Sequence, residues 1–220
     1  MSELENKLSQ YLEKAIKLAE QSKPESGNNK EKKVHPKVGC VIIKDNQEIA
    51  SACRNEYGDG DHAESTALRK CSQLDLSDAI LITTLEPCTI RKHDWQRGEY
   101  RRSCLELILH FGIKKVIIGI LDPNPDILGQ GYFELITKGV SVEFFPGELQ
   151  KRILDLNKQY ISFRRVLDME KKVQEKQVVS NFFAYKIREL NNSGLSFEVI
   201  EMILNIDNEV ARRVFGTALT

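Results

Sequence analysis

The segment His62-Ala63-Glu64 is followed along the chain by Glu86-Pro87-Cys88 and then by Cys104. One imidazole and two thiols can fill three of the four positions around a tetrahedral Zn²⁺ ion, and a catalytic zinc site leaves the fourth position for water. Glu64 lies two residues after His62, so on the first turn of a helix it can face that position without becoming a ligand. The sequence therefore predicts an open zinc site, with Glu64 as the catalytic proton shuttle.

The two motifs together are more specific than either one alone. Zinc deaminases carry an H-x-E motif and a P-C-x-x-C motif, and their glutamate is not a ligand. Here residues 89–103 separate the two cysteines, so the second motif is expanded. Each half follows a predicted strand and opens a predicted helix, where the helix dipole favours a thiolate. A structural zinc site, or no metal at all, is the alternative.

Composition limits the class of protein without choosing a function. The chain has 220 residues, of which 41% are hydrophobic, enough for one substantial core and a small appendage. No apolar run has the length of a membrane span, and the first residues lack a signal-peptide pattern. We therefore expect a cytoplasmic protein with no membrane partner. The formal net charge is zero, so overall charge does not favour nucleic-acid binding.

Five cysteines are an odd number, and in a reducing compartment they are expected as thiols or metal ligands. Cys40, Cys53 and Cys71 are interpreted as small buried residues.

Hydrophobic periodicity predicts an α/β fold. A helix is expected over 3–21, a loop over 23–33, and a hairpin from strands 38–44 and 48–53. The remainder alternates between helix and strand. It comprises a helix over 62–73, a strand over 79–84, a helix over 104–111, a strand over 115–120, a helix over 130–138 and a strand over 140–145.

Residues 34–165 resemble the cytidine-deaminase-like superfamily, and in particular the deaminase domain of bifunctional riboflavin-biosynthesis enzymes, the diaminohydroxyphosphoribosylaminopyrimidine deaminases. The stretches that carry the resemblance are 36–42, 62–64, 84–88, 112–116 and 121–125 with Gly129 and Gly131 after them. The resemblance implies a three-layer α-β-α fold with a five-stranded mixed sheet, and zinc held by His62, Cys88 and Cys104.

The resemblance also implies the reaction, which is hydrolytic removal of an exocyclic amine from a small amino-heterocycle. The expected substrate is a phosphorylated pyrimidine nucleotide or a riboflavin-pathway-like intermediate. Glu64 would take the water proton and protonate the ring nitrogen. It would later deliver a proton to the leaving ammonia. Ala63, Glu86, Pro87, Asp122 and Asn124 are the matching pocket residues.

Two positions depart from the family pattern. His35 stands where the family has an Asn that touches the substrate's sugar, and Asn55 stands where riboflavin-type deaminases have a His. We include both as substrate-binding candidates. The alternatives are a surface loop residue for His35 and a turn residue that caps its own backbone for Asn55.

The inserted segment 89–103 is a third departure, because it is basic and interleaved with aromatic residues. Arg91 and His93 are therefore candidates for holding a phosphate or stacking on a base. The alternative is that segment 89–103 is a solvated loop with no binding role. His93 could also replace Cys104 as third ligand, but Cys104 opens the helix that the family places there. A deaminase acting on single-stranded nucleic acid or tRNA is the runner-up function.

Beyond residue 165 the resemblance stops. An apolar stripe over 149–167 predicts one long helix, followed by a charged stretch over 170–176 and short helices over 196–204 and 208–215. The chain is too short for a reductase domain. We divide it into a zinc deaminase domain, 1–165, and a helical extension, 166–220, which suits homo-oligomerisation or docking better than a helix-turn-helix. A catalytically silent binding module is the alternative from another functional class.

Overall fold

The computed structural model describes residues 3–24, 34–58, 60–89, 102–124, 127–165 and 194. Within these residues the strands form one five-stranded sheet in the order β2-β1-β3-β4-β5. The β1–β2 and β1–β3 pairs are antiparallel, whereas β3–β4 and β4–β5 are parallel. The predicted mixed sheet is thus confirmed. Its strands are β1 (Gly39–Lys44), β2 (Gln47–Cys53), β3 (Ile80–Leu85), β4 (Lys115–Ile120) and β5 (Ser141–Phe144).

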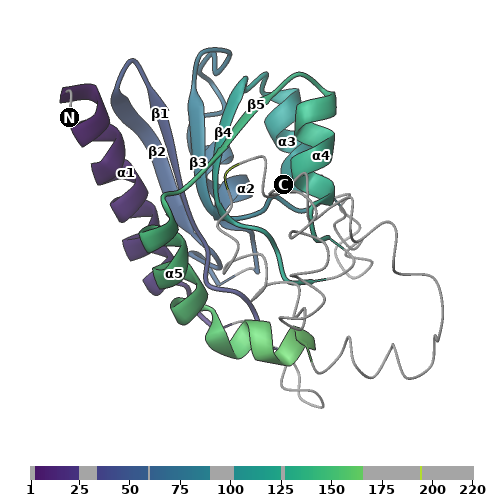
Figure 1. Cartoon of the computed structure of the whole chain (residues 1–220). Coiled ribbons are helices and arrows are strands. Elements are labelled where there is room, and N and C mark those ends of the chain that lie inside the picture. The colour runs from purple at the N-terminus through teal and green to yellow at the C-terminus, as the bar shows by residue number, and fades with distance from the viewer. Residues whose placement is uncertain are drawn as a thin grey trace, which may run out of the picture.

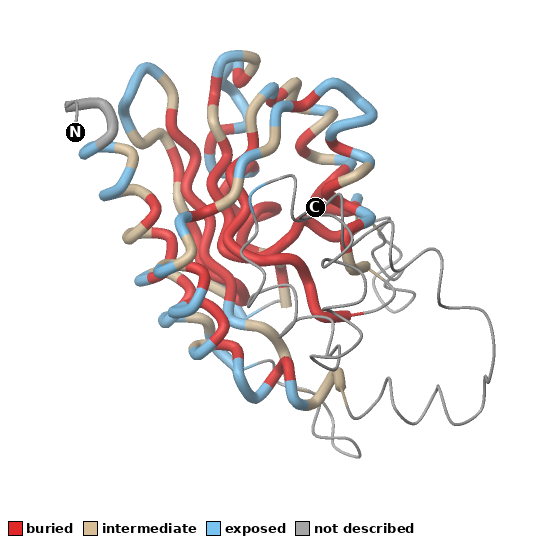
Figure 2. Tube along the Cα trace, in the orientation of Figure 1, coloured by how far each residue is buried: buried red, intermediate tan, exposed pale blue. Residues whose placement is uncertain are grey.

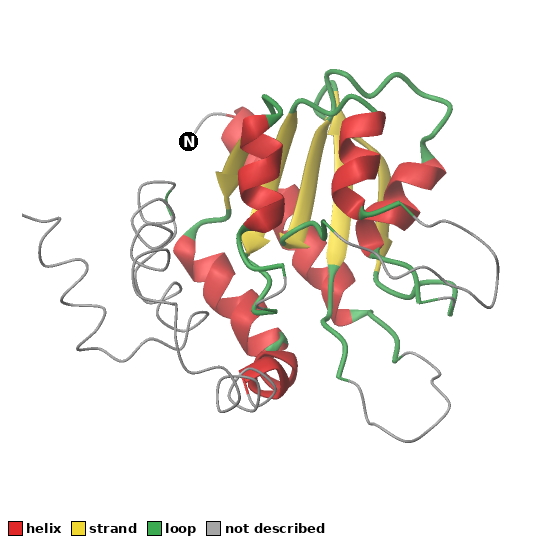
Figure 3. Ribbon diagram, turned by 90° about the vertical axis from the view of Figure 1, so that its right-hand side faces the viewer, coloured by secondary structure: helices red, strands yellow, loops and turns green. Residues whose placement is uncertain are grey.

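Helices cover both faces of the sheet, which gives the predicted three-layer α-β-α arrangement. On one face, α1 (Glu3–Glu20) packs on β1 and β3, and α5 (Gly147–Leu156) packs on β4 and on α1 (Figure 1). On the other face, α2 contacts β1 and β2, α4 contacts β5, and α3 lies between α2 and α4 (Figure 3). These three helices are α2 (Ala63–Lys70), α3 (Cys104–His110) and α4 (Gln130–Thr137).

The hydrophobic core is centred on the middle strands of the sheet. β3 and β4 are buried along nearly their whole length, because helices cover both of their faces. The edge strand β5 instead alternates between exposed and partly buried residues. Figure 2 shows this gradient, with buried residues concentrated in the middle of the sheet. Cys40, Cys53 and Cys71 are buried free thiols, as predicted.

The hairpin between β1 and β2 closes through Asp45 and Asn46, whose φ angles are +52° and +58°. Two successive residues with positive φ match the turn that follows the natural twist of a two-residue hairpin, and Asp and Asn tolerate that region. Lys44 therefore pairs directly with Gln47. β1 then pairs with β3 along its other edge, and its two buried faces pack against α1 and α2.

The predicted helix over 149–167 is interrupted at one residue. α5 ends at Leu156, Asn157 is a turn, and residues 158–165 are helical again. The Asn157 side chain accepts a hydrogen bond from Lys37 N (2.7 Å) and donates to Lys37 O (3.1 Å). Periodicity did not predict this break, because it arises from a contact with a segment 120 residues earlier.

Several expectations fall outside the described residues. Most of the loop predicted over 23–33 and nearly all of the extension 166–220 belong to this group, so the domain boundary at 165 stays a prediction. In the part of the chain that the structure describes, no helix combines the length and apolarity needed to cross a membrane.

Gly39, the first residue of β1, permits the closest approach between α1 and the sheet. A Cβ atom at this position would collide with Ala15 O and Ala19 N of α1, which are backbone atoms and cannot rotate away. Gly147, at the start of α5, has open space around the same position. An added methyl group therefore tests the close approach of α1 to β1 at Gly39, and only the effect of a glycine-to-alanine change in a helix at Gly147.

We predict that Gly39→Ala lowers the free energy of unfolding by about 3 kcal/mol, because α1 must move off β1. Gly147→Ala, the matched control, should change it by less than about 1 kcal/mol. Urea unfolding followed by circular dichroism measures both values. Equal stability of the two variants would show that the α1–β1 contact is not tight in solution.

Candidate active site

The three predicted ligand residues come from three different elements and meet at one point. His62 is the N-cap residue of α2, Cys88 follows β3, and Cys104 is the first residue of α3. The His62 Nδ1 atom lies 3.4 Å from Cys88 Sγ and 3.3 Å from Cys104 Sγ. The ligand atoms of all three residues lie within 4.8 Å of one another.

This geometry fits a zinc ion. With Zn–S near 2.3 Å and Zn–N near 2.0 Å, a tetrahedral ion separates its nitrogen and sulfur ligands by about 3.6 Å. The observed separations are only slightly shorter. The donor set is also suitable, because the pKa of Cys88 is lowered to about 4, first by the Cys104 side chain and then by His62, against the effect of burial. A thiolate at this position is ready to bind metal.

The start of α3 is built to hold Cys104 in place. Ser103 caps the helix by accepting from Glu106 N (3.1 Å), and the Glu106 carboxylate accepts from Ser103 N (2.6 Å). The Cys104 N–H in turn points to Cys88 Sγ at 3.4 Å. The helix N-terminus thus supplies both a ligand and a donor to its neighbour, which stabilises negative charge on sulfur.

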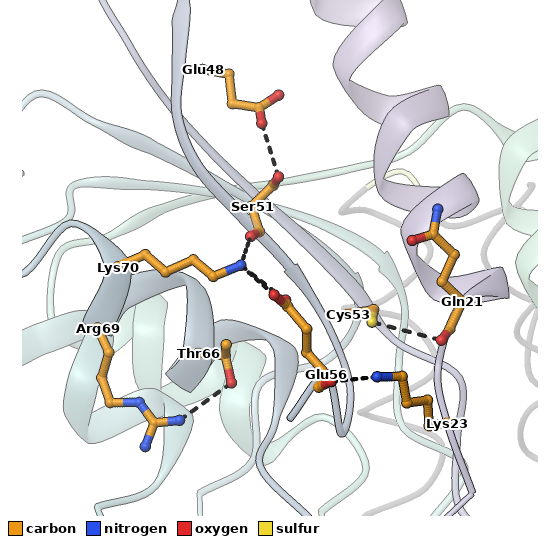
Figure 4. Close-up of polar contacts among 9 residues, drawn as sticks. All are labelled: Gln21, Lys23, Glu48, Ser51, Cys53, Glu56, Thr66, Arg69 and Lys70. Atoms are coloured by element: carbon orange, nitrogen blue, oxygen red, sulfur yellow. Dashed lines mark hydrogen bonds and ion pairs between the residues drawn. The ribbon is translucent and has the colours of Figure 1, made fainter. Parts of the chain in front are cut away.

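The loop that delivers His62 is tied to the body of the protein by polar contacts (Figure 4). Lys70 of α2 donates to Ser51 O (2.7 Å) and to the Glu56 carboxylate (2.7 Å). Lys23, after α1, donates to Glu56 O (2.7 Å). Asp61, which is buried next to His62 in the chain, forms an ion pair with Arg69. These contacts restrain the position at which α2 begins.

Asn55 belongs to this loop, and the structure supports the second of the roles considered for it. Its backbone has φ +55°, and its side chain is buried. The side-chain oxygen accepts from Gly60 N (2.8 Å), while the side-chain nitrogen donates to Lys23 O (3.2 Å) and Pro24 O (2.8 Å). Both amide hydrogens are therefore directed at backbone carbonyls. Asn55 therefore organises the turn, and a substrate contact by this residue stays a prediction.

Glu64 lies on the first turn of α2, buried beside the metal ligands. One carboxylate oxygen accepts from Thr83 Oγ1 (3.2 Å), and the other lies 3.6 Å from Cys104 Sγ. Burial raises the pKa of Glu64, whereas the charge of His62 and the residue's own backbone N–H lower it. Sequence reasoning missed Thr83. The available signal was the pair of threonines, Thr83 and Thr84, at the end of a strand that is otherwise aliphatic.

Glu86 has a different environment from the substrate contact that the resemblance implied. Its buried carboxylate accepts three backbone N–H groups, those of Asp122 (3.1 Å), Gly129 (2.9 Å) and Tyr132 (3.1 Å). Burial raises the pKa of Glu86 to about 8, and these three donors oppose the rise. The contacts join the Cys88 loop to the segment after β4 and to the start of α4. These three donors hold the loops around Glu86 together, and its predicted contact with substrate stays a prediction.

Asp122 is buried next to the same loop, after β4. Its Oδ1 atom accepts from Asn124 N (2.9 Å) and from the hydroxyl of Tyr160 (2.9 Å). Sequence reasoning missed Tyr160, because in the apolar stripe of the last helix it was interpreted only as a packing residue. Burial raises the pKa of Asp122, and the Asn124 and Tyr160 bonds lower it.

The remaining predicted substrate-binding residues lie at the following places. Ala63 and Pro87 are buried beside the ligands, Asn124 is buried after β4, and His35 is half-buried in the segment that leads into β1. Pro87 lies against α4, since a Cβ on Gly131 would collide with Pro87 O. Arg91 and His93 lie outside the described residues, as does most of the basic segment.

Comparison with known proteins agrees with this site. Residues 5–120 match the model of the cytidine and deoxycytidylate deaminase zinc-binding region. The chain is 33% identical over 158 residues to the diaminohydroxyphosphoribosylamino-pyrimidine deaminase of Buchnera aphidicola subsp. Schizaphis graminum, covering 71% of this chain and 93% of that protein.

Longer proteins match over the same region. The chain is 33% identical over 157 residues to the riboflavin biosynthesis protein RibD of Bacillus amyloliquefaciens, covering 70% of this chain and 37% of that protein. It thus spans little more than a third of that relative. The structure of Acinetobacter baumannii RibD superposes with a TM-score of 0.59 at 30% identity, covering 74% of this chain and 41% of the other.

The family match and the approach of the three side chains identify His62, Cys88 and Cys104 as zinc ligands. The chain belongs to the cytidine and deoxycytidylate deaminase zinc-binding family, and within it to the RibD type.

Proposed function

We propose that this protein is a hydrolytic deaminase that removes an exocyclic amine from a phosphorylated aminopyrimidine of the riboflavin-pathway type. The observation that carries the proposal is the position of Glu64. Its carboxylate is buried and reaches to within 3.6 Å of Cys104 Sγ, yet it is not one of the three grouped ligands. A buried carboxylate is costly to maintain unless it has a partner or a task. A proton shuttle beside a metal is such a task.

The metal and the protein divide the chemistry between them. Zinc, when bound, supplies Lewis acidity that makes water nucleophilic near neutral pH. Glu64 takes a proton from the attacking water and gives it to the ring nitrogen as the water oxygen bonds to the ring carbon. It then takes the remaining hydroxyl proton and gives it to the amine, which leaves as ammonia when its C–N bond breaks. The rise in its pKa by burial favours this exchange, because a shuttle works best when both of its protonation states are accessible. Thr83 holds one carboxylate oxygen, and the second oxygen lies 3.6 Å from Cys104 Sγ, on the side of the metal ligands.

The choice of substrate rests on the relatives. The Buchnera aphidicola protein is named a diaminohydroxyphosphoribosylamino-pyrimidine deaminase, and this chain covers 93% of it. We assign the sugar of this substrate class to the loop after β4, because a carboxylate such as that of Asp122 can accept hydrogen bonds from sugar hydroxyls. All five cysteines are free thiols, as expected in a reducing compartment, and a cytoplasmic location is part of this proposal. Homo-oligomerisation stays a prediction.

The direct test is ammonia release by zinc-loaded protein from a panel of phosphoribosyl-aminopyrimidines, deoxycytidylate, cytidine and single-stranded RNA. We expect turnover of the first class. Exclusive turnover of RNA would support the nucleic-acid alternative. No turnover of any compound would support a silent binding module.

The ligand set leads to a prediction about metal content. Purified protein should contain about one zinc per chain, and Cys88→Ala and Cys104→Ala should each lose most of it, because two ligands hold zinc poorly. Cys53→Ala is the matched control, since Cys53 is a buried free thiol outside the ligand group and should retain zinc. Inductively coupled plasma mass spectrometry measures the content. Full retention in Cys104→Ala would contradict the assignment, and His93→Ala should then be measured.

The shuttle role leads to a prediction for Glu64→Gln, which keeps the side-chain shape but cannot carry the proton. Zinc content and thermal stability should persist, while kcat should fall by roughly 10² to 10⁴. Glu134→Gln, an exposed change on α4, is the control and should keep wild-type kcat. Unchanged turnover in Glu64→Gln would remove this residue from the mechanism.

The basic segment leads to a prediction that separates a small substrate from a polymer. For a small phosphorylated substrate, at most one neutralisation should raise KM sharply, because an arginine–phosphate contact is local. For a nucleic-acid substrate, every neutralisation should instead weaken binding modestly, and the affinity should fall steeply as the salt concentration rises. We expect the first pattern. Binding and kinetics should be measured at several salt concentrations for variants at Arg91, Lys92, Arg97, Arg101 and Arg102.

A further inference from the structure

An arginine that the proposed mechanism does not use lies close to the substrate loop. In the helical residues 158–165, Tyr160 and Arg164 are one turn apart and lie on the same side of the helix. Arg164 Nε donates to the Tyr160 hydroxyl (3.2 Å), and this hydroxyl donates to Asp122 Oδ1 (2.9 Å). One tyrosine oxygen therefore connects the guanidinium to the carboxylate after β4.

The guanidinium group of Arg164 is held in one orientation. Besides the Nε bond, its carbon lies 5.3 Å from the centre of the Tyr160 ring, so the cation packs on the aromatic face. The side chain is half-buried. Tyr160 itself is buried, and its ring cannot move without breaking the Asp122 contact. Rotamer entropy that an arginine normally loses on binding a ligand has thus been lost already on folding.

The terminal nitrogens of Arg164 lack a carboxylate partner among the described residues. Other arginines are paired there: Arg152 with Glu13, at 2.6 Å, and Arg69 with Asp61. An arginine presents five N–H donors, of which Nε uses one here. The other four form the two-pronged edge that matches the oxygens of a phosphate. Within residues 3–165, as far as the structure describes them, the fork is therefore prearranged with no carboxylate bonded to its terminal nitrogens.

The position of the fork relative to the zinc ligands is set by a continuous path of contacts. Asp122 N donates to Glu86 Oε2 (3.1 Å), and Glu86 lies two residues before Cys88. Asp122 is close enough to Cys88 for their charges to interact. From the metal outward, the order is therefore Cys88, the Asp122 carboxylate, the Tyr160 hydroxyl and the Arg164 guanidinium. A ribosyl phosphate attached to a ring at the metal presents hydroxyls first and its anion last, which is the same order.

We propose that Arg164 binds the phosphate of the substrate, and that Tyr160 is a positioning residue that orients both Arg164 and Asp122. This inference rests on the proposed function, because it names the group of that substrate which the site recognises. A single fork next to a carboxylate selects one phosphate group. An extended polyanion would meet the negative charge of Asp122 beside it.

Binding of two small probes to zinc-loaded full-length protein tests the proposal without relying on turnover. Isothermal titration calorimetry with ribose 5-phosphate and with ribose should show that Arg164→Gln weakens binding of ribose 5-phosphate at least tenfold and leaves ribose unchanged. Arg152→Gln is the matched control, since it removes the same charge from α5 on the side facing Glu13. It should bind both probes like wild type. Equal binding of ribose 5-phosphate by Arg164→Gln and wild type would overturn the proposal.

Two further variants separate a lost contact from a lost fold. Arg164→Lys keeps the charge without the fork and should recover only part of the affinity. Tyr160→Phe keeps the packing but frees Arg164, so it should raise the KM of a phosphorylated aminopyrimidine more than that of its dephosphorylated form. An equal change in both KM values would show a general structural role and contradict the positioning role.

The outcomes of this test and of the functional test can be told apart. If wild-type protein releases no ammonia from any aminopyrimidine but loses ribose 5-phosphate binding on Arg164→Gln, the proposed function fails while the phosphate site stands. If aminopyrimidines are deaminated with a KM that Arg164→Gln does not change, the function stands and the phosphate site is wrong.

Discussion

The approach of the His62 imidazole to two cysteine sulfurs, at 3.3 and 3.4 Å, is the constraint on which the rest of the site depends. These side chains start from the N-cap of α2, the loop after β3 and the first residue of α3. All three starting points lie at one end of the sheet, because β2 and β3 are both antiparallel to β1 and therefore end at the same edge, from which the chain continues into α2 and α3. Helix N-termini at this point stabilise negative charge on sulfur, so the fold and the ligand chemistry support each other.

A second organising feature is the use of buried carboxylates to hold backbone loops. Glu86 accepts three N–H groups from the segment after β4 and the start of α4, and Asp122 accepts one N–H and one hydroxyl. A buried carboxylate without donors would be strongly destabilising, whereas one with several donors rigidifies the loops that supply them. These contacts link the metal loop to the expected substrate loop, so movement of one is restrained by the other. Glu64 differs, since its two side-chain donors are Thr83 and the ligand residue Cys104, so it borders the metal ligands.

The helical residues after α5 extend the site beyond the part of the chain that matches the deaminase zinc-binding model. Asn157 interrupts the helix and clamps the segment before β1, and Tyr160 then reaches Asp122. The interruption and the contact lie three residues apart, which is less than one helical turn. The loop after β4, the entry to β1 and the last described helix are therefore braced by one short stretch.

The sequence by itself determined the α/β fold, the hairpin at Asp45 and Asn46, and the ligand group His62, Cys88 and Cys104, because periodicity, turn residues and motif spacing are local properties of the chain. Only the tertiary structure showed the backbone partners of Asn55 and Glu86 and the side-chain contacts of Thr83, Tyr160 and Arg164. Most of these contacts join residues distant in sequence, such as Asp122 and Tyr160. Hydrogen bonds of this kind depend on which loops the packed sheet brings together, and local sequence patterns do not predict contacts between distant loops.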